Sequence, residues 1–178
     1  MKIRMVIISL GLLMVSVSAY CSEMPKLEDL ANTRYGLISV AEGEYVEGYI
    51  YINKKKSPFG DMYIGLEDKW EIGTKDVLLI SSGGRGTSCG AIYHFLIIEN
   101  KQAAFSASFG NCSVPEVTKI GETILVKFPR MNRYNPAETA QYENGKVTGM
   151  VNHSGMVNGK WVDRPKKLEE LKLKKVAF

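Results

Sequence analysis

The stretch best suited to chemistry is the glycine-rich segment from Ser81 to Ser88, which carries an arginine. Successive backbone N–H groups in such a loop can bind an anion. A nucleotide-binding phosphate loop also needs a lysine and a following helix, whereas this segment lacks lysine and leads into a β-branched, aromatic run. The sequence therefore argues against a nucleotide site.

Two interpretations of this segment remain. It is either a flexible connection between two core strands, as glycine-rich turns often are, or a loop that presents its arginine to a partner. An arginine at the tip of a loop can enter an acidic cleft and pair bidentately with a carboxylate. In the second interpretation the binding residues are Gly84, Arg85, Gly86 and Thr87.

Histidine is scarce, which limits both metal binding and general-base catalysis. The chain has two histidines, His94 and His153. His94 lies in an apolar run and is expected to be packed and hydrogen-bonded rather than catalytic. Two histidines without a free cysteine do not fill a typical zinc site. We therefore expect no metal and no cofactor.

Motifs of nucleophilic catalysis give no support for an enzyme. Gly86-Thr87-Ser88-Cys89-Gly90 has the spacing Gly-x-Ser-x-Gly, but it leads into an expected strand, whereas that motif needs a following helix. The chain has no Ser-x-x-Lys with its companion motifs. A cysteine–histidine pair would need Cys89 or Cys112 as a free thiolate, which an oxidising compartment disfavours. Carboxylates fall in or beside expected turns, and a catalytic pair of them is defined only by its separation in space. The sequence thus predicts a protein that is not an enzyme.

Three tyrosines, Tyr45, Tyr49 and Tyr51, are the clearest sign of a binding surface. They alternate with a valine and two isoleucines, so a strand here would have a core face and a tyrosine-rich outer face. Tyrosine is enriched at the centre of protein interfaces. The outer face either binds a partner or packs beneath a loop or the C-terminal tail.

The elements that would position these residues start with a hairpin after the glycine-rich segment. Its arms, Ala91–Glu99 and Gln102–Gly110, are rich in β-branched and aromatic residues and contain no proline. Asn100-Lys101 suits a two-residue turn, because asparagine adopts the left-handed conformation that such a turn requires. Glu99 then faces Gln102.

Continued along the hairpin, this register pairs His94 with Ala107 and sets Cys89 opposite Cys112. Directly opposed residues on neighbouring strands lie within disulfide distance. We therefore predict a disulfide between these cysteines, worth roughly 3 kcal/mol on the chain-entropy model. In this register the face of His94 also carries Ile92, Leu96 and Phe109.

Period-two alternation predicts further strands along the chain. Val77–Ser81 is a continuous apolar run typical of a strand buried on both faces. Lys54–Gly60, with its lysines and Pro58, is expected to be a solvated turn. Asn144-Gly145 and Asn158-Gly159 predict hairpin turns. The other expected strands are Leu37–Val40, Tyr45–Asn53, Asp61–Leu66, Trp70–Ile72, Glu116–Ile120, Thr123–Phe128 and a three-stranded meander from Thr139 to Val162.

This pattern favours an all-β fold. Pro25–Asn32 is compatible with a short helix, and Lys166–Lys175 suits either a helix or a strand. About eight to ten short strands, with at most short helices near the two ends, predict an antiparallel sandwich or a partly open barrel. The chain length after residue 19 suits a single domain.

The first nineteen residues have the layout of a secretory signal peptide: two basic residues, an apolar run and then small residues up to Ala19. Cleavage is expected after Ala19 or as late as Ser22. The apolar run is too short to span a bilayer as a helix, which takes about 20 residues. Tyr20 stands before Cys21, where lipidation needs a small residue, so a lipoprotein is not expected.

The sequence therefore predicts an exported domain, residues 20–178, with a basic tail at 164–178. We expect it in a bacterial periplasm or secreted, where disulfides form. The full chain's formal charge of +4 includes Lys2 and Arg4, so the exported domain is only slightly basic. Most of its basic excess lies in Lys54–Lys56 and the tail, neither of which has the interleaved aromatics of a nucleic-acid surface.

The functional expectation is a non-catalytic module whose partner is another protein, most simply an inhibitor or immunity protein that blocks a toxin or hydrolase acting in the periplasm. A module that binds a small ligand or an envelope polymer is the alternative. A cell-wall-acting hydrolase ranks third. The sequence leaves the oligomeric state open.

Overall fold

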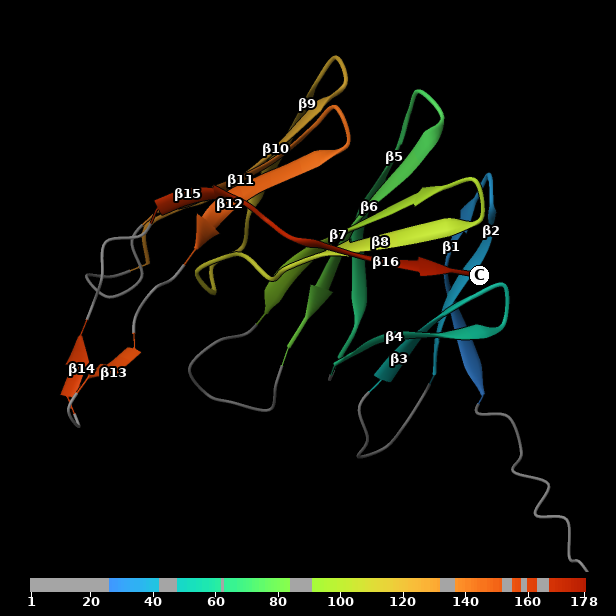
Figure 1. Ribbon diagram of the computed structural model, residues 1–178, viewed down its shortest axis with the longest axis horizontal. Coiled ribbons are helices and arrows are strands. Elements are labelled where there is room, and N and C mark those ends of the chain that lie inside the picture. The colour runs from blue at the N-terminus through green and yellow to red at the C-terminus, as the bar shows by residue number, and fades with distance from the viewer. Residues whose placement is uncertain are drawn as a thin grey trace, which may run out of the picture.

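The computed structural model describes residues 26–41, 48–61, 63–83, 91–131, 137–151, 155–157, 160–162 and 167–178. These residues form sixteen strands and no helix, which confirms the predicted all-β class (Figure 1). The strands outnumber the expected eight to ten, because segments expected as turns or helices are strands. The predicted signal peptide lies outside the described residues.

Fourteen of the strands form three antiparallel sheets. The first sheet has the order β1-β2-β3-β4, with β1 (Leu27–Thr33), β2 (Gly36–Ala41), β3 (Gly48–Ile52) and β4 (Lys55–Asp61). The second has the order β16-β8-β7-β6-β5, with β5 (Gly65–Ile72), β6 (Lys75–Ser82), β7 (Ile92–Glu99), β8 (Gln102–Ser106) and β16 (Leu173–Ala177).

The third sheet has the order β15-β12-β11-β10-β9, with β9 (Glu116–Ile120), β10 (Thr123–Phe128), β11 (Glu138–Glu143), β12 (Lys146–Val151) and β15 (Lys167–Glu170). The remaining strands, β13 (Gly155–Val157) and β14 (Lys160–Val162), pair only with each other. The described strands close no barrel, so the sandwich is the architecture that the structure supports.

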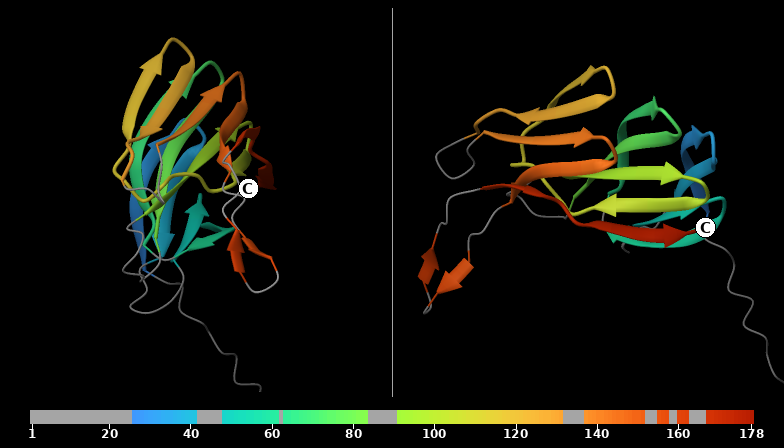
Figure 2. Two further views of the ribbon diagram at one scale, coloured as in Figure 1. Left: turned by 90° about the vertical axis from the view of Figure 1, so that its left-hand side faces the viewer. Right: turned by 45° about the horizontal axis from the view of Figure 1, so that its top comes forward.

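The second sheet lies between the other two and is buried on both faces (Figures 1 and 2). Its strand β6 alternates accordingly, with Leu78 packing toward the first sheet and Leu79 toward the third. Both side chains are fully buried. The continuous apolar run at 77–81 is therefore a strand buried on both faces, as predicted.

Asparagine sets the tight turns of the hairpins. Asn53-Lys54, Asn100-Lys101 and Asn144-Gly145 all have positive φ at both residues, the geometry of a two-residue turn that matches strand twist. The predicted opposition of Glu99 and Gln102 is confirmed. The turn predicted at Asn158-Gly159 lies outside the described residues, although the strands beside it pair with each other.

The predicted register of the β7–β8 hairpin holds only near the turn. Leu96 pairs with Phe105 as expected, but the next pairing is between Tyr93 and Phe109, so the second arm contains one extra residue. His94 therefore does not pair with Ala107, and Phe109 lies on the opposite face from His94, with Tyr93.

Ser106 is the physical reason for this shift. Its Oγ accepts the Phe95 N–H at 2.9 Å and donates to the Ala107 carbonyl at 2.9 Å, in place of a strand-to-strand bond. The prediction of a Cys89–Cys112 disulfide assumes an unshifted register, and that register ends at Ser106. Because Cys89 lies outside the described residues, the disulfide stays a prediction.

Three local predictions are wrong. Lys54–Gly60 is not a solvated turn, because residues 55–61 form β4, an edge strand where Pro58 costs no interior strand-to-strand bond. No helix forms over Pro25–Asn32, because residues 27–33 form β1. The expected three-stranded meander is instead two separate hairpins, β11–β12 and β13–β14. The tail, whose sequence suits either a helix or a strand, forms the strands β15 and β16.

Candidate functional site

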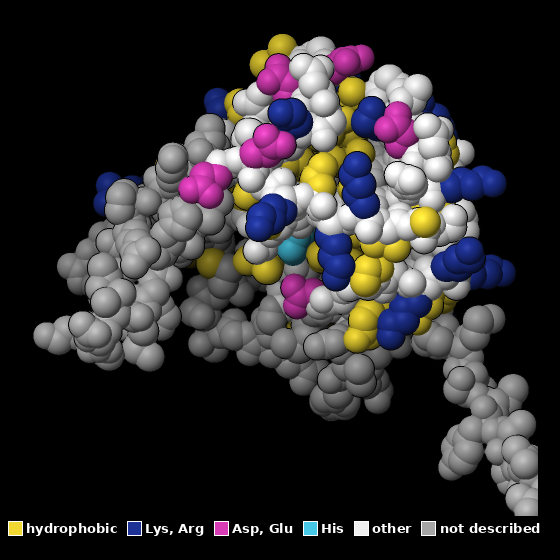
Figure 3. Space-filling view, in the orientation of Figure 1, with side chains coloured by type: hydrophobic (Ala, Val, Ile, Leu, Met, Phe, Trp, Pro, Cys, Tyr) yellow, Lys and Arg dark blue, Asp and Glu magenta, His cyan; other side chains and the backbone are white. Residues whose placement is uncertain are grey.

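An open groove lies between β4 of the first sheet and the β8–β16 pair of the second sheet, and we call it the β4–β16 groove. It encloses about 520 Å³. Figure 3 shows the histidine colour in a hollow between basic and hydrophobic side chains. The groove is lined by Pro58, Phe59, Gly60, His94, Phe105, Ser106, Ala107, Lys172, Leu173 and Lys174.

Aromatic rings form much of the groove's inner surface. Phe59 from β4 and Phe105 from β8 stack with ring centroids 4.8 Å apart and nearly parallel planes. Phe59 also meets the ring of His94 edge to face, at 4.7 Å between centroids. Phe105 belongs to the core between the first and second sheets, whereas Phe59 is only half-buried. The groove thus exposes the margin of that core.

His94 lies in the groove lining with 8% of its surface exposed. Its Nδ1 lies 3.1 Å from the Ser106 carbonyl oxygen. Because a carbonyl oxygen only accepts, Nδ1 carries the hydrogen. Among the described residues Nε2 has no hydrogen-bond partner. In the neutral ring Nε2 is therefore an unused acceptor.

Burial keeps this imidazole neutral. Desolvation lowers the pKa of His94, opposed in part by its hydrogen bond to the Ser106 carbonyl and by the charge of Asp61. Asp61 ends β4 and accepts a hydrogen bond from the Ser82 hydroxyl at 2.8 Å. The predicted packed and hydrogen-bonded histidine is confirmed, with Ser106 as its partner.

Two lysines give the groove a basic rim. Lys174 pairs with Phe105 across β16 and β8, so its side chain lies on the same face as that ring. Lys172, two residues earlier, lies on the same side, and its carbonyl accepts the Ala107 N–H at 3.0 Å. Both lysines are exposed. The rim is therefore positively charged above an apolar floor.

The sequence-predicted site residues do not line this groove. Tyr45, Gly84, Arg85, Gly86 and Thr87 lie outside the described residues. Tyr49 and Tyr51 lie on the outer face of the first sheet, because the alternate residues Ile50 and Ile52 fill its core face. The prediction of a core face and an outer face for this strand is confirmed.

The outer tyrosines lie beside a lysine. The Lys56 ammonium lies 3.3 Å from the centroid of the Tyr49 ring, and Tyr51 pairs with Lys56 across β3 and β4. The Tyr49 ring also covers Gly60, where a Cβ would come within 2.6 Å of it. Both tyrosines are half-buried, which fits packing within the sheet as well as binding.

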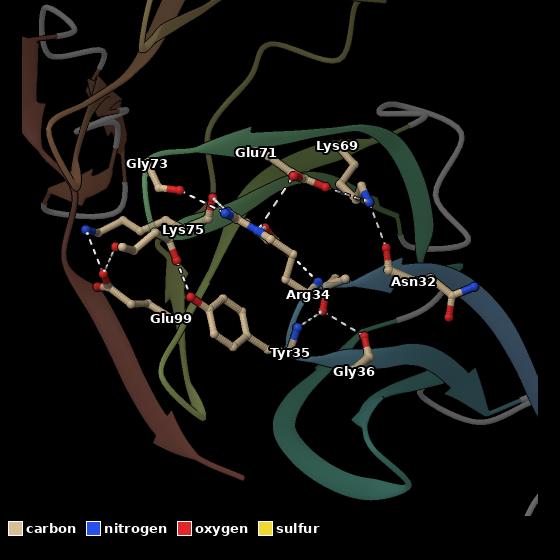
Figure 4. A network of polar contacts seen from close by, with 12 residues as sticks. Asn32, Arg34, Tyr35, Gly36, Lys69, Glu71, Gly73, Lys75 and Glu99 are labelled. Carbon is tan, nitrogen blue, oxygen red and sulfur yellow. Dashed lines mark hydrogen bonds and ion pairs between the residues drawn. The ribbon is translucent and has the colours of Figure 1, made fainter.

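A second polar cluster joins the first and second sheets (Figure 4). Asp76 is fully buried and accepts hydrogen bonds from the backbone N–H and the Nε of Arg34, both at 2.6 Å. The other guanidinium nitrogens donate to the Gly73 and Lys75 carbonyls at 2.8 and 2.6 Å. Each guanidinium nitrogen donates a hydrogen bond within the protein, so this cluster fixes two turns together rather than offering a site.

Metal and membrane features are also missing from the described part of the chain. No group of three or more His, Cys, Asp or Glu side chains there could hold a metal ion. The described residues also contain no helix that is long and apolar enough to cross a membrane.

Sequence reasoning missed the groove because its residues come from distant parts of the chain. Phe59 was assigned to a turn, and Phe105 was seen only as a hairpin residue. The Lys172–Lys174 alternation was the one available signal, since strand spacing puts both lysines on one face.

Comparison with known proteins identifies no relative of this chain. No protein-family model matches the chain. Searches of the curated proteins and of the solved structures likewise find no match.

Proposed function

We propose that the protein is an exported, non-catalytic binding module whose partner is another protein. The form we favour is an inhibitor or immunity-type protein that blocks a toxin or hydrolase acting in the periplasm. The observation that carries this proposal is the β4–β16 groove, an open apolar channel with lysines on its rim.

The composition of the groove supports a protein partner. Interface centres are apolar and aromatic, and their rims are polar. Phe59 and Phe105 supply such a centre, and Lys172 and Lys174 supply the rim. An exposed basic rim also speeds the approach of an acidic partner. The favoured contact is therefore an acidic segment of the partner.

The strands that border the groove support an extended segment. β4 and β16 are the end strands of their sheets among the described residues. End strands are the places where extended peptides are commonly bound. An open groove between two of them suits a loop or strand better than an enclosed small molecule.

Co-purification from the cell envelope tests this function. We expect the tagged protein to retain one identified partner, and the double variant Lys172→Glu with Lys174→Glu to lose it. The matched control is Lys119→Glu with Lys127→Glu, which makes the same charge change at exposed positions of the third sheet. Addition of the protein should then suppress the partner's activity. Equal retention by both double variants would contradict the proposal.

The predicted disulfide belongs to the same proposal, since export to an oxidising compartment allows it. We expect Cys89 and Cys112 to resist alkylation until the mature protein is reduced, and then to take up one alkyl group each. Cys21, which cleavage after Ala19 retains, reacts equally with and without reductant. Mass measurement before and after reduction decides this. Alkylation of both thiols without reductant would rule out the bridge.

The stacked aromatic pair favours a second candidate, a module that binds a small ligand or an envelope polymer. Aromatic surfaces with a few polar groups are typical of ligand sites. Titration of the isotope-labelled protein with soluble peptidoglycan fragments should then give saturable NMR shifts at Phe59, His94 and Phe105. Shifts scattered over the surface would exclude this candidate.

A further inference from the structure

We propose that the β4–β16 groove recognises an acidic peptide segment through a tyrosine whose phenolic O–H donates a hydrogen bond to His94 Nε2. This inference rests on the proposed protein-binding function and names the chemistry of the segment that the groove binds.

The unused acceptor is the first observation. With Nδ1 donating to the Ser106 carbonyl, the neutral ring of His94 offers only the Nε2 lone pair. That atom is buried and has no partner among the described residues. A buried acceptor without a partner is unfavourable, and a donor from a ligand removes this penalty. The groove therefore favours a ligand group that ends in an O–H or N–H.

The charge and apolar character of the groove surface limit which side chain can supply this donor. A carboxylate has no hydrogen to donate, and a lysine or arginine is repelled by Lys172 and Lys174. A serine is too short to fill the apolar groove. A tyrosine brings an aromatic ring that can pack beside Phe59 and Phe105, and it carries a donor at its tip. Tryptophan also joins a ring to a donor, but its N–H lies on the edge of a larger double ring. Tyrosine, whose donor is at the tip of a single ring, meets these conditions best.

The rim selects what surrounds that tyrosine. Lys172 and Lys174 lie on one side of the chain, about 7 Å apart at the usual rise of a strand. Their ammonium groups suit carboxylates on either side of the tyrosine. In a segment rich in Asp or Glu around one tyrosine, the carboxylates can pair with the rim lysines while the tyrosine ring packs on the apolar floor.

Phe59 is the side chain that must adjust. Nε2 is covered in the free protein, so a ligand reaches it only after a neighbouring group moves. The Phe59 ring contacts His94, is half-buried and stands on an end strand. A rotation of this ring gives up its stacking with Phe105 and opens the floor of the groove, and an incoming tyrosine ring can replace that contact.

Two matched peptides test the inference. One has glutamates on both sides of a single tyrosine, and the other has phenylalanine in its place. Calorimetry on the full mature protein should show about tenfold tighter binding of the tyrosine peptide, as expected for one hydrogen bond to a buried acceptor. The preference should vanish in His94→Phe and persist in His94→Gln, whose amide oxygen can accept.

A second measurement guards against a variant that fails to fold. In the wild-type protein labelled with nitrogen-15, the tyrosine peptide should shift the His94 Nε2 resonance, and the phenylalanine peptide should not. Equal affinity for the two peptides, with no Nε2 shift, would overturn the inference while leaving the charge-dependent protein-binding function intact. If neither peptide bound, the inference would also be overturned. The co-purification experiment tests the broader protein-binding function separately.

Discussion

His94 shows how one residue links stability to the candidate site. Its burial between β4 and β8 keeps the ring neutral, and its single hydrogen bond fixes which nitrogen carries the proton. The sequence predicted its packing, because an isolated histidine in an apolar strand is usually buried and bonded. It did not predict its partner, because Ser106 shifts the hairpin register.

The lowered pKa of His94 predicts a loss of stability in mild acid. The unfolded chain, with a histidine pKa near 6.5, binds a proton that the folded protein does not. Stability is therefore complete above about pH 6.5 and falls as the pH drops below that value toward the folded pKa. Urea unfolding of the wild type and of His94→Gln across this range measures it.

The stability of the wild type relative to His94→Gln should therefore fall as the pH falls. His153 is present in both, so its titration cancels in the comparison. Parallel curves for the two proteins would show that His94 does not govern the acid response.

At the scale of the element, the β7–β8 hairpin depends on a side chain as much as on its backbone. Ser106→Ala removes the acceptor of the Phe95 N–H and leaves that buried group unpaired. We expect a cost of about 1–3 kcal/mol in the free energy of unfolding. The exposed neighbour gives a control, since Ser108→Ala should change stability by less than about 0.5 kcal/mol.

Chemical denaturation of both serine variants measures the difference. If Ser106→Ala were as stable as Ser108→Ala, the Ser106 hydroxyl would not be what stabilises the extra residue in the second arm of the hairpin. The observed pairing of Tyr93 with Phe109 would then need another cause.

Turns were predictable from the sequence and the groove was not, for a physical reason. Asn100-Lys101 and Asn144-Gly145 determine their own conformation, because the left-handed backbone is a local preference. β4 was missed because a lysine run and Pro58 look like a loop locally, and only its place at the end of a sheet makes a strand possible. Residues of the groove meet through tertiary packing alone.

At the scale of the whole molecule, the second sheet connects two cores. Leu78 and Leu79 are neighbours in β6 that face different sheets, and both are fully buried. We expect each leucine-to-alanine change to cost about 2–5 kcal/mol. Because one sheet carries both cores, each variant should still unfold in a single transition.

Far-UV circular dichroism and tyrosine fluorescence, followed through the same urea titration, test this expectation. Coincident curves for both leucine variants indicate one cooperative unit. Separate transitions in either variant would show that the first and third sheets unfold independently of each other.

The path of the last strands has a consequence for biosynthesis. The chain leaves β15 in the third sheet and, after only Leu171 and Lys172, joins the second sheet as β16 (Figure 1). The lysine rim of the groove is therefore translated after every strand of the third sheet. A nascent chain that already includes Phe59, His94 and Phe105 still lacks Lys172 and Lys174. The charge-dependent binding proposed for the groove therefore requires β16 to have been synthesised.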